Sequence, residues 1–321
     1  MTSFWRSGVR FPSAPGSSRR SRQTGQPVRR VGRRPLTGHR PLTGARTGGT
    51  VTIFTPFDTA ERRAWAGRAA AYERSFATLC AHPVPALLDA AGVRRGLRVL
   101  DAGTGTGNAA QAAGSRGATV TAVDADPGMA TRAAATAPDT AVCVAALPRL
   151  PFADGHFDAV VGNLVLNHVG RPRAALAELR RVARPGARIA LSIWAAPPAP
   201  GQALFGRALQ AAGVTRPAHL PTLAAEDDFP RTEEGFGGLL HETGLTAVRC
   251  ETLTWEHRTT AEQWWSGPAA GVASAGQILV SRPPEVITEV RRQYDALCAE
   301  FMGPDGMLVL PHTALLASAQ V

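Results

Sequence analysis

The chain has 321 residues, a hydrophobic fraction of 44% and a formal net charge of +10. This length is enough for one large or two small domains with a buried core. The sequence predicts neither a transmembrane helix nor a secretory signal, because its apolar runs are too short to span a bilayer and none follows the basic N-terminus. Its four cysteines form no CxxC pair, which argues against a metal site and favours free thiols in a reducing cytoplasm.

The positive charge is confined to the N-terminal segment. Residues 1–50 contain eleven Arg and no Asp or Glu. Residues 51–321 therefore contain 24 of the chain's 35 basic residues and all 25 acidic residues, which gives them a net charge of about −1. The segment is rich in Arg, Gly, Ser, Pro and Thr, and such a composition cannot bury enough apolar surface to offset its ordering entropy. We therefore divide the chain into a disordered Arg-rich leader, 1–50, and a near-neutral domain, 51–321.

Three interpretations of the leader stay open. It has no role, it is an arm that contacts nucleic acid or lipid, or it is not translated because Val51 is the start. The near-neutral domain is not expected to bind nucleic acid, because binding to a phosphate backbone requires clustered cations on the binding face.

Two helices are predicted directly after the leader. Residues 58–80 show the periodicity of one amphipathic helix, with Asp58 or Thr59 as its N-cap. A proline separates it from a second helix, 84–92, which ends at Gly92.

Strand and helix signals then alternate. Short buried strands are expected at 98–101, 119–123, 141–145, 157–162 and 188–194. Helices are expected between them at 108–115, 127–136 and 172–183. Such alternation predicts right-handed crossovers and a parallel sheet covered by helices.

The remainder of the chain is less regular. Helices are predicted near 201–212, 233–244 and 284–302, and strands at 247–257 and 307–318. Nothing indicates a separate second domain, so we expect the segments after the fifth strand to form a lid or a substrate wall.

The stretch DAGTGTGN, residues 101–108, joins the first strand of the alternation to its first helix. In an open parallel sheet, ligands bind beyond the carboxyl ends of the strands. Glycines at 103, 105 and 107 permit unusual backbone torsions and close approach of a ligand, and the following helix offers unpaired N–H groups.

Two classes of cofactor fit such a turn. Dinucleotides usually accompany GxGxxG, but here the spacing is GxGxG, and Asn108 stands where the last glycine belongs. A carboxylate at Asp101 would be unfavourable beside a pyrophosphate, whereas it suits an ammonium group. S-Adenosylmethionine carries an ammonium, a carboxylate and a sulfonium but no phosphate.

Asp124 ends the second strand. Its carboxylate is placed to accept both hydroxyls of a ribose, a geometry that does not separate the two cofactor classes. The alternative for Asp101 and Asp124 is a helix cap or a turn-forming residue.

Four blocks of sequence, in order and with family-like spacing over residues 98–194, resemble class I S-adenosylmethionine-dependent methyltransferases. They are VLDAGTGTGN, VTAVDADPGM, LPFADGHFDAVVGNLVLNHV and ELRRVARPGARIALSIW. The resemblance is strongest to the branch that includes the ubiquinone/menaquinone C-methyltransferases and many small-molecule methyltransferases. It implies a doubly wound, mostly parallel seven-stranded α/β sheet of Rossmann-like type with helical lid insertions. It also implies S-adenosylmethionine as cofactor and in-line transfer of a methyl group to an O, N or C atom of a small-molecule acceptor.

The resemblance also implies roles for individual residues. The methionine pocket would be shaped by Gly103, Gly105 and Gly107. Asp124 would hold the ribose, and the adenine would meet Met129 and the backbone N–H of Leu147. Asn163 would lie near the methionine end. Tyr72 either closes over the cofactor or is ordinary packing.

One position departs from the family pattern. An acid often precedes A-x-x-LPF, where it accepts the adenine amino group, and Ala146 occupies that position here. We expect weaker discrimination of adenine, by about 1 kcal/mol for one net hydrogen bond.

His168 is the leading candidate for a general base, which is needed only if the nucleophile must lose a proton. The alternative is a structural histidine. His257 and His312 are weaker candidates, because both also fit sheet or loop packing. Three tryptophans fit either an aromatic substrate pocket or packing within the core or lid, namely Trp194, Trp264 and Trp265.

Two other functions compete with methyl transfer. An NAD(P)-dependent oxidoreductase would use a related sheet, but Asp101, the GxGxG spacing and the absence of any lysine argue against it. A nucleic-acid-binding protein would depend on the leader alone. The fourth-strand motif GNLVLNH also lacks the [DN]PP[YFW] signature of methyltransferases that act on base amino groups.

Overall fold

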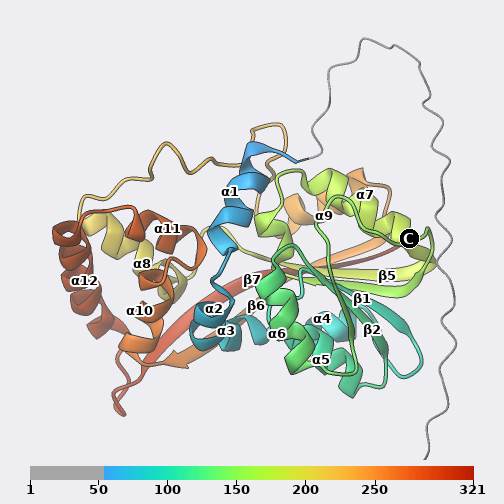
Figure 1. Ribbon diagram of the computed structural model, residues 1–321, viewed down its shortest axis with the longest axis horizontal. Helices are drawn as coiled ribbons and strands as arrows, with labels where there is room; N and C mark the ends of the chain where they lie inside the picture. The colour runs from blue at the N-terminus through green and yellow to red at the C-terminus, as the bar shows by residue number, and fades with distance from the viewer. Residues whose placement is uncertain (1–53) are drawn as a thin grey trace, which may run out of the picture. The chain divides into compact units, whose positions relative to one another are not determined.

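A computed structural model of the chain describes residues 54–321 (Figure 1). The predicted leader, 1–50, lies outside the described residues, so the division of the chain at residue 50 stays a prediction. Within 54–321, no helix reaches the length and apolarity needed to cross a bilayer.

Seven strands form one sheet in the order β3-β2-β1-β4-β5-β7-β6. Strands β1 to β5 are parallel, and β7 runs antiparallel to both β5 and β6. The bounds are β1 Arg98–Ala102, β2 Thr119–Asp124, β3 Ala141–Val144, β4 Phe157–Asn163, β5 Ala183–Trp194, β6 Thr246–Thr259 and β7 Leu308–Gln320. The strand order reverses between β1 and β4, which is where a doubly wound sheet binds its ligand. The predicted doubly wound, mostly parallel seven-stranded sheet is confirmed.

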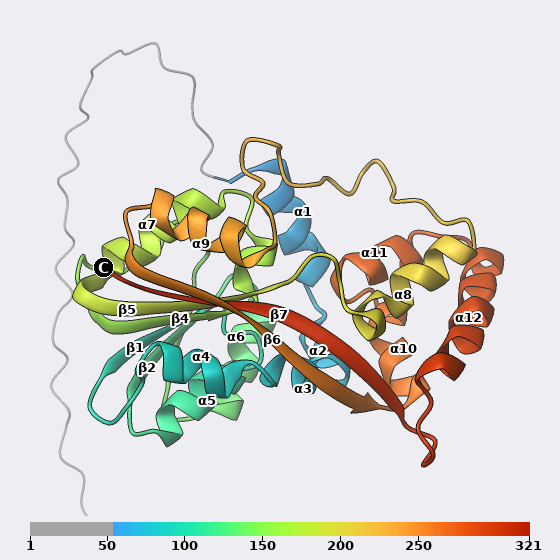
Figure 2. The same cartoon turned by 180° about the vertical axis from the view of Figure 1, so that it is seen from behind.

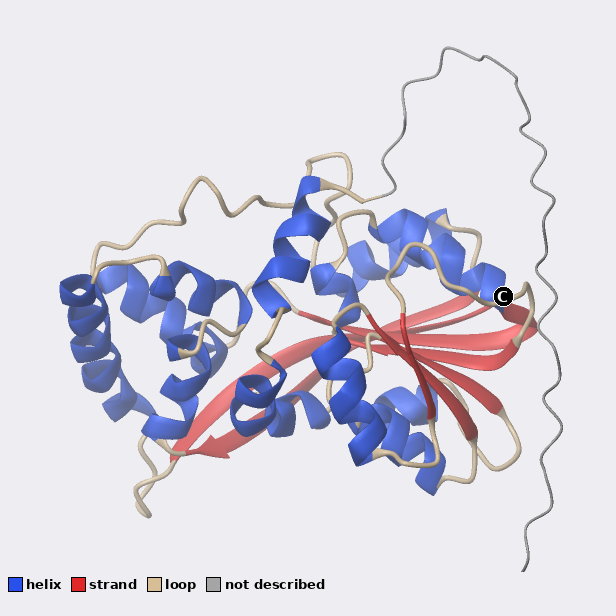
Figure 3. Cartoon of the chain, viewed as in Figure 1, coloured by secondary structure: helices blue, strands red, loops and turns tan. Residues whose placement is uncertain are grey.

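Helices cover both faces of this sheet (Figure 3). The flanking helices are α4 Val84–Ala90, α5 Asn108–Ser115, α6 Pro127–Thr136, α7 Pro172–Val182 and α9 Glu233–Glu242. The pleat of β4 explains the division: Val160 packs into the core under α7 and α9, whereas Ala159 and Val161 pack into the core under α4 and α5. Each face of the sheet therefore has its own apolar core.

A helical lid lies at the ends of β6 and β7 that extend past the parallel strands (Figure 2). It consists of α8 Pro200–Ala211, α10 Ala261–Ala269, α11 Ala273–Val280 and α12 Pro284–Cys298. A third apolar core holds it together, with Leu204, Trp264, Leu279, Tyr294 and Leu310 among its buried members. The predicted helices near 201–212 and 284–302 are confirmed, whereas α10 and α11 were not predicted.

The single helix predicted over 58–80 is wrong. The segment forms α1 Pro56–Trp65, α2 Ala69–Ser75 and α3 Ala77–Ala81. Gly67 ends the first of these with a φ of +74°, a left-handed conformation that glycine adopts without strain.

The predicted N-cap of that helix is also wrong. Thr55 is the cap, and Asp58 accepts hydrogen bonds from its backbone N–H and its hydroxyl at 2.7 and 2.8 Å. Asp58 also accepts from the backbone N–H of Gly170 at 2.7 Å, which fixes α1 to the segment before α7.

Candidate active site

A cavity of about 400 Å³ opens at the carboxyl ends of β1, β2 and β4. The turn after β1, the short helix η1 (Val165–His168) after β4, and α1 to α3 supply much of its wall. Many residues that the sequence singled out line it, among them Tyr72, Gly103, Gly105, Asp124, Met129, Leu147, Asn163 and His168. Asp101 lines a small adjoining pocket beside Tyr72, Gly103, Gly105 and Asn163. Segments far apart in the chain therefore meet at one site.

The glycines of the turn have different physical roles. A Cβ on Gly103 would lie 2.2 Å from Val165 Cγ2, so only glycine lets η1 approach the turn this closely. Gly105 has a φ of +55° and donates its backbone N–H to Asp124 Oδ2 at 2.8 Å. Gly107 does not line the cavity; a Cβ there would lie 2.9 Å from the Cα of Ala133, so it permits α5 and α6 to pack.

Asp101 is fully buried at the end of β1. Its Oδ2 accepts a hydrogen bond from Thr104 Oγ1 at 2.7 Å, but Oδ1 has no partner among the described residues. Burial raises the pKa of Asp101 to about 6. A buried carboxylate oxygen without a donor is unfavourable, and a ligand that brings an N–H group would relieve it.

Asp124 receives backbone N–H groups on both oxygens, from Gly105 at 2.8 Å and from Asp126 at 2.9 Å. Burial raises the pKa of Asp124, and these two hydrogen bonds lower it in part. Asp126, which sequence analysis missed, caps α6 by accepting the N–H of Met129 at 2.8 Å. Asp124 is therefore not the helix cap, although it does form a turn, and its carboxylate lines the cavity.

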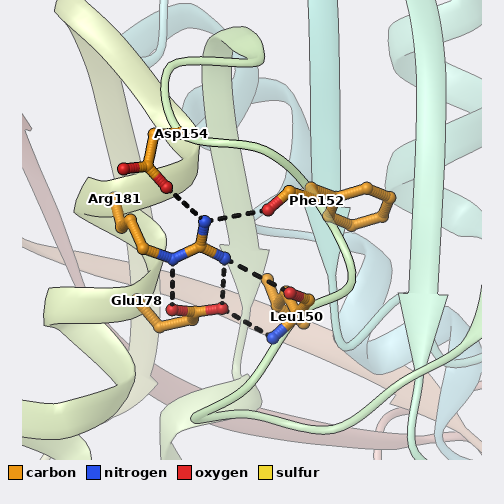
Figure 4. Close-up of polar contacts among 5 residues, drawn as sticks. All are labelled: Leu150, Phe152, Asp154, Glu178 and Arg181. Carbon is orange, nitrogen blue, oxygen red and sulfur yellow. Dashed lines mark hydrogen bonds and ion pairs between the residues drawn. The ribbon is translucent and has the colours of Figure 1, made fainter. Parts of the chain in front are cut away.

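Arg181 of α7 holds the segment that follows Leu147 (Figure 4). Its guanidinium donates to the carbonyls of Leu150 and Phe152 at 3.2 and 2.8 Å, and to the carboxylates of Asp154 and Glu178. Glu178 also accepts the N–H of Leu150 at 2.6 Å. Although burial opposes it, these hydrogen bonds lower the pKa of Glu178. Both residues lie in the block ELRRVARPGARIALSIW, which carries part of the family resemblance, and their contacts fix the segment that follows Leu147.

Asn163 uses its side chain within the protein. It donates to the carbonyl of Cys80 at 2.6 Å and accepts from Ser192 Oγ at 2.7 Å, so it joins β4 to α3 and β5. The half-buried Tyr72 packs edge to face on Trp65, with ring centroids 5.6 Å apart. Burial raises the pKa of Tyr72, so its hydroxyl stays protonated.

His168 pairs with a carboxylate that sequence analysis missed. His168 Nδ1 lies 2.8 Å from Glu61 Oε2 and 3.4 Å from Trp65 Nε1. The indole N–H of Trp65 can only donate and the carboxylate of Glu61 can only accept, so Nδ1 cannot satisfy both in one tautomer. The shorter contact, to Glu61, favours a hydrogen on Nδ1, and in that neutral tautomer Nε2 carries the lone pair. Glu61 and Trp65 stand four residues apart on α1, so both side chains lie on the helix face that meets His168.

The aromatic candidates divide between cavity and core. Trp194, Trp264 and His312 line the cavity. Trp265 does not; it packs against Tyr294 with ring centroids 5.2 Å apart. His257 is buried among these rings and also does not line the cavity.

The family described as "Methyltransferase domain" matches residues 100–191. A demethylmenaquinone methyltransferase of Beutenbergia cavernae is 38% identical over 179 residues, which are 53% of this chain and 74% of that protein. An uncharacterized protein of Mycobacterium tuberculosis is 31% identical over 271 residues, or 78% of this chain and 94% of that one.

Among solved structures, a phosphoethanolamine N-methyltransferase of Haemonchus contortus, determined with S-adenosylhomocysteine, has a similar fold. Its TM-score is 0.50 at 16% identity, covering 84% of this chain and 60% of that one. The comparisons support neither the oxidoreductase nor the nucleic-acid-binding alternative. Since the family match spans β1 to β5 and a named methyltransferase is similar over most of its length, the chain belongs to the S-adenosylmethionine-dependent methyltransferases.

Proposed function

We propose that the chain transfers a methyl group from S-adenosylmethionine to an oxygen, nitrogen or carbon atom of a small-molecule acceptor, and that His168 takes up the proton lost. The observation that carries this proposal is the 2.8 Å contact between Glu61 Oε2 and His168 Nδ1 at the wall that Asp124 also lines. A cofactor cavity alone fits many reactions. A carboxylate-oriented imidazole beside it fits removal of a proton from a nucleophile.

The described residues fit the cofactor. When bound, S-adenosylmethionine supplies an electrophilic methyl group on a positively charged sulfur. The unpartnered Oδ1 of Asp101 suits the ammonium group of its amino-acid part, and the Asp124 carboxylate suits the two ribose hydroxyls. Met129 and the backbone N–H of Leu147 would meet the adenine.

Glu61 has two roles in this proposal. By accepting the Nδ1 hydrogen it holds His168 in the tautomer whose Nε2 is free to take a proton. Once Nε2 is protonated, the ring is cationic, and the carboxylate stabilises that charge. The chain's remaining contribution is to orient the acceptor and exclude water, which is worth several kcal/mol when the geometry is near attack.

The size of the cavity supports a small-molecule acceptor. About 400 Å³ lies within the range of small-molecule sites, and in this proposal the cofactor and the acceptor would share it. A relative named demethylmenaquinone methyltransferase is consistent with an acceptor of this class.

A binding experiment tests the cofactor assignment without an acceptor. The melting temperature of the full chain is measured with S-adenosylhomocysteine, NADH or duplex DNA. We expect only S-adenosylhomocysteine to raise it, and Asp124→Ala to abolish that rise. Stabilisation by NADH alone, or a normal response of Asp124→Ala, would contradict the proposal. Methyl transfer is then assayed across quinols, phenols and amines.

The location of the protein and the extent of the catalytic domain are further parts of the proposal. All four cysteines lie in the described residues, and none is in a disulfide, which supports a cytoplasmic location. We propose residues 51–321 as the methyltransferase domain, supported by the continuous sheet from β1 to β7 and by a lid that packs on its last strands.

A further inference from the structure

Among the described residues, none of the charged side chains that line the cavity comes from the helices of the lid. They come from α1, from the end of β2 and from the cap of α6: Asp58, Glu61, Arg62, Asp124 and Asp126. The end that the lid encloses has uncharged walls, among them Phe76, Trp194, Gln202, Phe205, Trp264 and His312. A charged ligand group would lose its hydration at the lid end of the cavity without meeting an opposite charge.

Aromatic rings from separate parts of the chain surround the lid end of the cavity. Trp264 of α10 packs edge to face on His312 of β7, with ring centroids 5.4 Å apart, and on Phe76 at 5.0 Å. Trp194 at the end of β5 lies 6.0 Å from His312. Inclined rings at these separations also pack well against an inserted aromatic ring.

His312 presents a hydrogen-bond acceptor here. Its Nδ1 lies 2.8 Å from the carbonyl of Leu310, so Nδ1 carries the hydrogen and Nε2 carries the lone pair. The residue is only 2% exposed, and burial lowers its pKa to about 4. The ring is therefore neutral at pH 7 and accepts a hydrogen bond without retaining the proton.

Gln202 of α8 supplies the complementary donor. Its Oε1 accepts the backbone N–H of Thr313 at 3.4 Å, which leaves the NH₂ group of the amide available to donate to a ligand. A Cβ on neighbouring Gly201 would lie 2.7 Å from the backbone of Leu310, so α8 is docked closely on β7. Because His312 directly precedes Thr313 in β7, Gln202 and His312 are neighbours in the cavity wall.

A hydroxyl group satisfies both side chains at once, because it donates one hydrogen bond and accepts another. An ether or a ketone would set its own lone pairs against the lone pair of His312. A carboxylate would do the same and would also lose its hydration. An ammonium group would find no carboxylate at this end.

We infer that the lid end of the cavity binds an uncharged, planar aromatic molecule through a hydroxyl group that His312 and Gln202 recognise. This inference rests on the proposed function, since it names the acceptor class for the same site. It assigns His312 to recognition and leaves proton removal to His168, because only His168 has a carboxylate to stabilise its charged form.

Binding of three probes tests the inference: 2-naphthol, 2-methoxynaphthalene and 2-naphthoate. Each is titrated calorimetrically into the full chain saturated with S-adenosylhomocysteine. We expect 2-naphthol to bind at least about tenfold more tightly than the ether, and the carboxylate to bind most weakly. Equal affinity for naphthol and ether, or preference for the carboxylate, would overturn the inference.

Variants test whether His312 and Gln202 recognise the hydroxyl group. His312→Leu should bind naphthol and ether equally, whereas His312→Gln, which retains an acceptor, should keep part of the preference. The matched control is His241→Leu, on the exposed side of α9, which should behave as the unmodified chain. If His312→Leu does not fold, Gln202→Leu replaces it and should reduce the preference. Retention of the full preference in whichever of these variants folds would overturn the inference.

The same titrations separate this inference from the proposed function. Glu61→Gln and His168→Gln should bind the probes within about twofold of the unmodified chain, because neither side chain recognises the hydroxyl. If the predicted probe pattern holds but no acceptor is methylated, the proposed reaction fails and the aromatic site stands. If methylation occurs but the pattern is absent, the aromatic site fails alone.

Discussion

Asp101 is a carboxylate that the fold buries with one oxygen unpartnered. Burial raises its pKa to about 6 in the folded chain, above the ordinary value of 3.8. The folded chain therefore holds this proton to a higher pH than the unfolded chain does. The stability of the free protein that results is lost progressively as the pH rises from about 4 to about 6. A bound ammonium group would reverse this preference, because it stabilises the ionised form.

Cofactor affinity should accordingly depend on pH. We expect the affinity for S-adenosylhomocysteine to fall as the pH is lowered through about 6, because protonated Asp101 no longer attracts the ammonium group. Calorimetric titration between pH 5 and pH 8 measures this. Asp101→Asn is the control: it should bind at least about tenfold more weakly at pH 8 and lose this pH dependence. An unmodified chain with constant affinity across that range would rule out the role of Asp101.

Glu61 offers a second test at the residue scale. In Glu61→Gln the amide oxygen can still accept from His168 Nδ1, so the ring keeps its orientation but loses the charge that stabilises its cationic form. We expect kcat to fall by about 10²-fold for an acceptor that must lose a proton, with little change in affinity for S-adenosylhomocysteine. Steady-state kinetics and calorimetry measure the two quantities. Glu234→Gln, on the exposed surface of α9, is the matched control, and unchanged kcat in Glu61→Gln would remove the general base from the mechanism.

Among the elements, η1 depends on the absence of a side chain at Gly103. A Cβ there would lie 2.2 Å from Val165 Cγ2, and η1 ends at His168. Gly103→Ala should therefore displace the short helix and lower both stability and kcat. Val165→Ala removes the contact with Cγ2 but leaves the Cβ of residue 165 at 2.6 Å, so the double variant should recover only part of the loss; the strain of a φ of +71° also remains. Denaturant unfolding of the four chains gives the coupling energy, and additive effects would show that the two positions do not interact.

The elements of the sheet could be predicted because their signals are local. The runs at β1, β2 and β4 are short, apolar and bounded by turn residues, and each is followed along the chain by a helix that packs on the sheet. The break of the first helix was missed because Gly67 stands in an otherwise periodic segment, and a single glycine does not always end a helix. The helices α10 and α11 pack within the lid, and their tertiary context rather than their periodicity defines them.

The candidate site was predictable to the same extent. Asp101, the glycine turn and Asp124 follow successive strands, so topology alone brings them to one edge of the sheet. Glu61 and His168 are 107 residues apart in the chain, so no local spacing in the sequence predicts their contact. The proximity of Gln202 and His312 depends on how α8 docks on β7, which only the packed lid determines.

At the scale of the whole molecule, all the motifs that indicate methyl transfer lie in residues 51–321, which are nearly neutral, and none lies in the Arg-rich leader. Removal of residues 1–50 should leave kcat, KM for S-adenosylmethionine and melting temperature unchanged within error. The comparison requires both chains at the same ionic strength, because eleven arginines alter non-specific association. A large loss of activity in the shortened chain would favour the arm interpretation.

Strand β7 belongs to two parts of the protein at once. Leu308 and Leu310 pack in the core of the lid, whereas Leu315, Ala317 and Ala319 pack in the core of the sheet. Any inserted or deleted residue midway along it would turn alternate side chains to the opposite face and carry His312 away from the cavity. The helices of the lid can therefore vary without disturbing the sheet, whereas the length of β7 is fixed by both cores at once.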